Sequence, residues 1–114
     1  MPLLRNASTN RIIATRIVRL SGFFRRALGL LGRGSLEPNE GAWIAPCNAI
    51  HTIGMRVPID VIFLDARGCV VQLESCVLPN RPALLCRRAK AVVELGSGAL
   101  HRSDLAVGDY LEMS

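Results

Sequence analysis

The chain has 114 residues, half of them hydrophobic, and a formal net charge of +5. This length suits a single domain over residues 1–114, which can bury a core without disulfides or a structural metal. Arginine recurs too often for a transmembrane span, and the N-terminus lacks the apolar stretch of a signal peptide. We therefore expect a cytoplasmic protein whose four cysteines are reduced thiols.

The positive charge is concentrated in residues 1–36, which contain seven arginines and no acidic residue. Residues 37–114 contain seven basic and nine acidic side chains, a net charge of −2. An arginine-rich face indicates either a solvated surface or a binder of an anionic partner. Nucleic acid is disfavoured, because the neighbouring aromatics, Phe23 and Phe24, belong to an apolar stripe and form no stacking platform.

The first elements follow from local patterns. Residues 11–20 are rich in β-branched side chains and predict a half-buried strand. Apolar residues in 23–31 recur at helical spacing, which predicts one short N-terminal helix. Residues 43–45 predict a short strand that ends before a proline. Residues 59–64 and 69–78 predict two strands of a hairpin joined by a four-residue turn.

Two short strands are predicted in the last quarter of the chain. Residues 91–95 are β-like and are followed by glycines, and residues 110–113 follow a turn signal. Several strands separated by turns, with one early helix, indicate a mainly β domain of the α+β class. We expect a small antiparallel barrel or sandwich.

Residues 54–68, GMRVPIDVIFLDARG, resemble the small bacterial and archaeal proteins of domain of unknown function family 192. Flanking pieces at 28–33, 91–95 and 107–109 extend the resemblance over about residues 22–113. The resemblance implies a compact, mainly β fold and no particular activity. Many members carry Trp-Met-x-Asn-Thr before the proline and aspartate. This chain has a different sequence at 51–55, so a role of that Asn-Thr pair does not carry over.

Residues 41–65 concentrate functional residue types in an otherwise apolar segment. Cys47 and His51 are four residues apart, a spacing that places two side chains on one side of a helix or strand. With Asp60 they predict an alternative function, a thiol-dependent hydrolase or transferase with Cys47 as nucleophile, His51 as base and Asp60 as orienter. The competing interpretation is a buried structural thiol beside a histidine that bonds the backbone.

The same three side chains, Cys47, His51 and Asp60, are also candidates for a mixed metal site. They lack a fourth protein ligand, and no CxxC or HxH pair occurs in the sequence. We therefore expect no metal and no cofactor. Asp60 begins an apolar strand, where a carboxylate either accepts backbone hydrogen bonds or contacts a ligand.

The sequence contains no complete catalytic or metal signature, so it favours a small binding or accessory domain without independent catalysis. The expected ligand surface is the segment 46–58 together with Asp60. The expected contacts there are His51, Thr52, Met55, Arg56 and Asp60. A small polar or anionic ligand suits the cations and exposed backbone N–H groups of such a segment, and a protein partner is the alternative.

Overall fold

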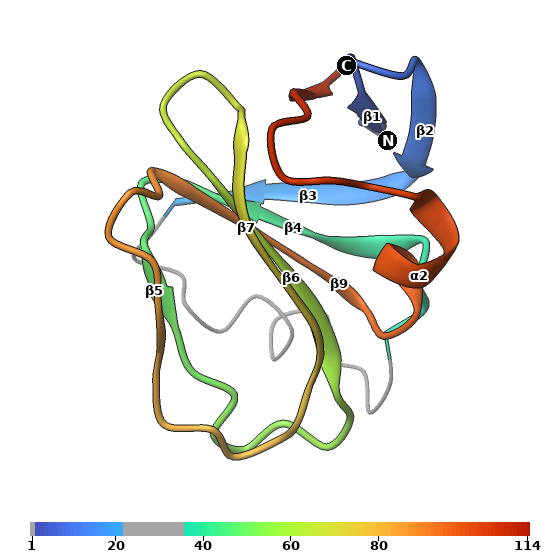
Figure 1. Ribbon diagram of the computed structural model, residues 1–114. Coiled ribbons are helices and arrows are strands. Elements are labelled where there is room, and N and C mark those ends of the chain that lie inside the picture. Colours follow the sequence, from blue (N-terminus) through green and yellow to red (C-terminus); the bar gives the residue numbers. More distant parts are fainter. Residues whose placement is uncertain (1, 22–35) are drawn as a thin grey trace.

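The computed structural model describes residues 2–21 and 36–114, and their strands form three sheets (Figure 1). The main sheet has the order β3 (Arg16–Leu20), β4 (Glu40–Ile44), β9 (Ala91–Gly96), β6 (Ile59–Leu64), β7 (Val70–Val77). A second sheet has the order β10 (Leu111–Met113), β1 (Leu4–Asn6), β2 (Arg11–Ala14). The third pairs β5 (Ala49–Ile50) with β8 (Leu84–Leu85), and the helix α2 spans Ala99–Ser103.

The predicted strand over residues 11–20 is two strands in two different sheets. β2 pairs with β1, and β3 pairs with β4, so the chain passes from one sheet to the other at Thr15. The Asn39 side chain accepts the Thr15 N–H at 2.9 Å, and its backbone carbonyl accepts the Arg16 N–H at 3.1 Å. This change of partner explains why the apolar residues of the run do not alternate strictly.

The main sheet is mixed and not purely antiparallel, because β3 and β4 run parallel. A parallel pair needs a long crossover connection, which here contains residues 22–35. The predicted helix over 23–31 falls in that connection and lies outside the described residues. The strands of residues 2–21 and 36–114 confirm a mainly β fold, and they do not close into a barrel.

The predicted hairpin of residues 59–64 and 69–78 is confirmed as β6 and β7, which pair antiparallel. Every residue of β6 is buried, and its side chains alternate between the two faces of the main sheet. Ile62 and Leu64 point to one face, where β1, β2, β10 and α2 form a covering layer. Val61 and Phe63 point to the other face, toward β5 and β8.

Among the described residues, the two largest apolar clusters lie on either side of the sheet. The α2-side cluster consists of Leu4, Ile13, Ala14, Ile17, Ile62, Leu64, Val70, Ala91, Val93, Leu95, Ala99 and Leu111. The β5-side cluster consists of Ile50, Ile59, Val61, Phe63, Val77, Leu84, Cys86, Ala89 and Val92. Figure 1 shows β1, β2, β10 and α2 at the upper right and β5 on the opposite side of the main sheet.

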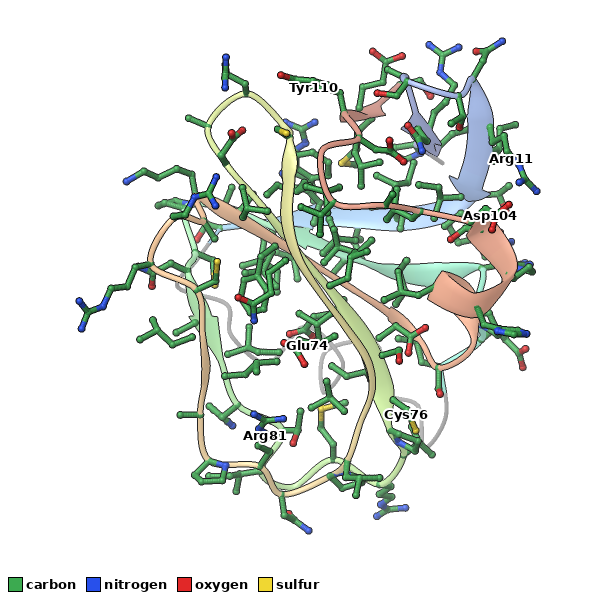
Figure 2. All side chains as sticks on the ribbon, in the orientation of Figure 1. Arg11, Glu74, Cys76, Arg81, Asp104 and Tyr110 are labelled. Carbon is green, nitrogen blue, oxygen red and sulfur yellow. The ribbon has the colours of Figure 1, made fainter. Side chains whose placement is uncertain are left out.

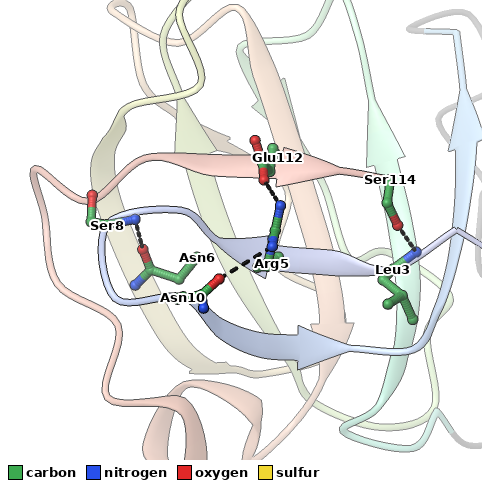
Figure 3. A network of polar contacts seen from close by, with 7 residues as sticks. All are labelled: Leu3, Arg5, Asn6, Ser8, Asn10, Glu112 and Ser114. Carbon is green, nitrogen blue, oxygen red and sulfur yellow. Dashed lines mark hydrogen bonds and ion pairs between the residues drawn. The ribbon is translucent and has the colours of Figure 1, made fainter.

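Residues near the two ends of the chain pair in the second sheet. β1 and β10 are antiparallel partners, and the Leu3 N–H donates to the Ser114 hydroxyl at 3.4 Å (Figure 3). No helix among the described residues is long and apolar enough to cross a membrane.

Candidate functional site

Asp60 lies at the start of β6 and is 1 % exposed. Its Oδ1 accepts the Cys76 N–H at 2.8 Å. Its Oδ2 accepts the N–H groups of Gly98 at 3.1 Å and Leu100 at 2.9 Å. Both carboxylate oxygens therefore serve backbone groups, which come from β7 and from the start of α2.

These hydrogen bonds give Asp60 a structural role. Gly98 is the N-cap residue of α2, and no side chain near it in sequence caps the helix. The first N–H groups of a helix have no partner within the helix, so a carboxylate that accepts them stabilises its start. Asp60 thus joins β6, β7 and α2 on the α2 side of the main sheet.

Cys47 and His51 flank β5 and are both half-buried. The Cys47 thiol donates to the Ala49 carbonyl at 3.2 Å, and its backbone N–H donates to the Lys90 carbonyl at 3.0 Å. His51 Nδ1 accepts the Ile53 N–H at 3.3 Å. Within the described part of the chain, no hydrogen bond connects Cys47 with His51 or either of them with Asp60.

The two faces of the sheet separate Asp60 from Cys47. Cys47 packs against the β5-side cluster, which takes Ile59 and Val61 from β6. Asp60 lies between these residues in the strand, so its side chain points to the opposite face. The structure therefore places the proposed nucleophile and the proposed orienter on different sides of the main sheet.

Thr52 is buried and connects two loops. Its hydroxyl donates to the Leu78 carbonyl at 2.7 Å and accepts the Arg81 N–H at 2.8 Å. Its backbone N–H donates to the Arg81 carbonyl at 2.9 Å, and its carbonyl accepts the Asn80 N–H at 2.8 Å. These four bonds hold the loop after β5 against the loop after β7, so the Thr52 side chain is engaged within the protein.

We expect Thr52→Val to lower the free energy of unfolding by about 2 kcal/mol, because the isosteric side chain leaves the Leu78 carbonyl and the Arg81 N–H without their partner. Thr52→Ser keeps the hydroxyl and is expected to cost less than about 1 kcal/mol. Urea unfolding of both variants measures the difference. Equal losses for valine and serine would show that the hydroxyl is unimportant.

The other two predicted ligand residues differ in exposure. Met55 is half-buried and packs against the β5-side cluster. Arg56 is exposed. Of the five expected contacts, His51, Met55 and Arg56 are therefore the ones whose side chains are not engaged by several internal hydrogen bonds.

The most unusual polar residue of the described structure is Glu94, at the centre of the main sheet. It lies in the middle strand, β9, directly between Ala42 of β4 and Val61 of β6. It is 3 % exposed. Among residues 2–21 and 36–114, no group forms a hydrogen bond or ion pair with its carboxyl.

The sheet register fixes the direction of the Glu94 side chain. Val92 is two residues away in the same strand and belongs to the β5-side cluster, so Glu94 points to that face as well. The backbones of β4 and β9 approach closely at Gly41. A β-carbon at this position would lie 1.8 Å from the main-chain carbonyl oxygen of Glu94, so only glycine fits there. β4 and β9 thus pack closely beside this carboxyl.

A second polar pair lies on the same face, one strand beyond Val61. Glu74 of β7 pairs with Val61, and the Gln72 side chain donates to Glu74 Oε2 at 2.8 Å. Figure 2 shows Glu74 on the side of β6 and β7 that faces β5. We call the group of side chains formed on this side of the main sheet by Ala42, Val61, Gln72, Glu74 and Glu94 the Glu94 face.

Burial raises the pKa of Glu94 from its ordinary value of 4.5 to about 7. The physical cause is desolvation, because the carboxylate loses its hydration inside the protein and the described residues supply no compensating partner. A carboxyl group with this pKa changes its charge near neutral pH. Perturbed acids of this kind are more frequent at functional sites than elsewhere.

Our sequence-based site list did not include Glu94, although a signal for it is present. It follows three apolar residues of the β-like run 91–95, so it is a carboxylate within an apolar strand. Asp60 is likewise a carboxylate within an apolar strand. The sequence alone does not distinguish the two, because the difference lies in the backbone donors that reach Asp60 and not Glu94.

The N-terminal arginine face is largely neutralised where the structure describes it. Arg5 pairs with Glu112, as Figure 3 shows, Arg11 pairs with Asp104, and Arg16 pairs with Glu40. These acids come from later parts of the sequence. The separation of charge along the chain therefore does not persist in the folded protein at these three positions.

Comparison with protein-family models gives a match to domain of unknown function family 192, described as "Uncharacterized ACR". The match covers residues 5–113, almost the whole chain. No match to a curated protein was found.

Two solved structures share the fold. One is described as a "putative transcription regulator" from Sinorhizobium meliloti 1021, with a TM-score of 0.79 and 21% identity, covering 98% of this chain and 91% of that one. The other is a protein of unknown function from Novosphingobium aromaticivorans DSM 12444, with a TM-score of 0.70 and 18% identity, covering 97% and 82%. At these identities the similarity establishes the fold and not an activity.

Proposed function

The chain belongs to domain of unknown function family 192, and we propose that it is a small binding or accessory domain without catalysis of its own. The proposed ligand is a small polar molecule. It would lie against the Glu94 face, with the segment 46–58 as the adjoining wall.

The observation that carries this proposal is the buried Glu94 carboxyl, for which no partner occurs among the described residues. An unpaired buried carboxyl costs free energy, and such groups in native proteins usually have a partner or a function. Asp60, another deeply buried acid of the main sheet, has three backbone donors. A ligand that supplies a partner to Glu94 would account for the difference.

The wall adds groups that suit a polar ligand. Arg56 is exposed and His51 is half-buried on the segment 46–58, while Met55 packs on the β5-side cluster. The Thr52 hydrogen bonds hold this segment in a fixed position relative to the loop after β7. A preorganised wall lowers the entropic cost of binding.

The cellular location we propose is the cytoplasm. None of the four cysteines forms a disulfide with another in the described structure. Free thiols persist in reducing compartments.

A screen of polar metabolites, read by thermal unfolding and by amide chemical shifts, tests the binding function. We expect at least one compound to raise the melting temperature and to shift the amides of Ala42, Val61 and Glu74. A panel of ester, thioester and amide substrates should show no turnover. The proposal fails if no compound moves these amides, or if the pure protein hydrolyses the panel.

A further inference from the structure

The Glu94 face carries two carboxyl groups in one row of the main sheet. Glu94 of β9 and Glu74 of β7 both pair with Val61, from its two sides. Adjacent strands are about 4.8 Å apart, so the two backbones are separated by about 10 Å at this row. Side chains of this length bring their carboxyl groups within reach of one small ligand.

The surroundings of this row are apolar. Ala42 and Ile44 form a small buried group on one side of Glu94, and the β5-side cluster lies on the other. Cys47 packs against both. A ligand here would therefore combine a polar end at the carboxyl groups with an apolar body beside them.

The charges that face this row come from several elements. Glu40 of β4 and Arg16 of β3 point to the same face, and Arg16 is paired with Glu40 at 3.5 Å. Glu74 of β7 bonds with Gln72.

The covering elements contribute the other titratable side chains. The thiols of Cys47 and Cys86 pack against the β5-side cluster, and His51 lies on the adjoining wall. Within the described residues, no cation on this face forms an ion pair with Glu94 or Glu74.

We propose that the Glu94 face binds the ammonium group of a small organic amine, with Glu94 as its ionic partner and the Glu74–Gln72 pair as a second acceptor. This inference rests on the proposed binding function and names the ligand class of that site. The apolar part of the amine packs on Val61 and Ala42. An anion is disfavoured here, because both acidic groups would repel it.

Binding of an ammonium ion is coupled to ionisation of Glu94. Burial raises the pKa of this group to about 7, so at lower pH the carboxyl is protonated and must lose its proton to form the ion pair. The affinity should therefore increase about tenfold between pH 6 and pH 8 and change little above that. A neutral ligand that accepts a hydrogen bond from the protonated acid would show the opposite trend.

The test uses n-butylammonium, with n-butyrate and n-butanol as probes of the same size and different charge. Amide chemical shifts of the full-length protein are followed at pH 6, 7 and 8 for the wild type, Glu94→Gln and the exposed control Glu37→Gln. We expect butylammonium to shift the amides of Ala42, Val61 and Glu74. The dissociation constant should rise at least tenfold in Glu94→Gln and remain unchanged in Glu37→Gln.

The other outcomes overturn the inference in distinguishable ways. Equal binding of butylammonium to wild type and Glu94→Gln removes Glu94 as the ionic partner. If butyrate or butanol shifts the same amides and butylammonium does not, the amine class is rejected and the binding function is retained. If no probe shifts these amides, the amine class is rejected, and the broader metabolite screen decides the binding function separately.

Discussion

Replacing Asp60 by alanine is expected to lower the free energy of unfolding by about 4 kcal/mol. The substitution removes an acceptor that is almost fully buried and that binds the N–H groups of Cys76, Gly98 and Leu100. Hydrogen bonds to a charged group contribute about 1.5 to 3 kcal/mol each, and losses at one site are not additive. Urea unfolding measures the loss, and hydrogen exchange at Gly98 and Leu100 shows whether the start of α2 loosens.

Asp65→Ala is the matched control for this prediction. Asp65 also accepts two backbone N–H groups, from Arg67 and Cys69, but at the more accessible turn between β6 and β7. Its removal should cost much less than the removal of Asp60, because water can replace the lost acceptor. Two results would contradict the structural role of Asp60. One is a loss of unfolding free energy below about 1 kcal/mol for Asp60→Ala, and the other is unchanged hydrogen exchange at both Gly98 and Leu100.

Glu94→Gln is expected to stabilise the protein at pH 8 by about 3 kcal/mol relative to the wild type. Burial raises the pKa of Glu94 from 4.5 to about 7, so the folded state retains a proton that the unfolded state has released in this range. The stability associated with the protonated group is fully present below pH 4.5 and is lost as the pH rises through about 7. Glutamine is neutral throughout and does not lose it.

The measurement is the free energy of unfolding of both proteins at intervals between pH 4.5 and pH 8. The difference between Glu94→Gln and wild type should be near zero at pH 4.5 and should increase to its full value above pH 7. Taking the difference removes the titration of the remaining carboxyl groups, which both proteins share. Parallel curves for the two proteins would mean that Glu94 ionises normally in the folded state.

Patterns of adjacent residues were sufficient to predict much of the main sheet. The six apolar or buried residues of β6 and the turn before β7 are local features, and the hairpin was predicted from them correctly. The pairing of β3 with β4 is not local, because residues 21–39 separate the two strands. A single β-rich run at 11–20 also contains no signal that its halves join different sheets.

The helix α2 was not predicted, and the reason is physical. Its N-terminal N–H groups are accepted by Asp60, about 40 residues earlier in the chain, so the local sequence needs no capping side chain. The same contacts explain why Asp60 could not be separated from a ligand-binding residue by sequence. The alternative catalytic function grouped Asp60 with Cys47 and His51, whereas alternation along β6 directs Asp60 to the face opposite Cys47.

The most direct test of this account is a pH titration of the Glu94 side-chain carboxyl, followed by carbon-13 NMR of glutamate-labelled protein and assigned with Glu94→Gln. We expect a midpoint near 7, because the carboxyl is buried on the Glu94 face without a partner among the described residues. A midpoint close to 4.5 would contradict it, because the carboxyl would then be hydrated or paired and would need no ligand to supply a partner.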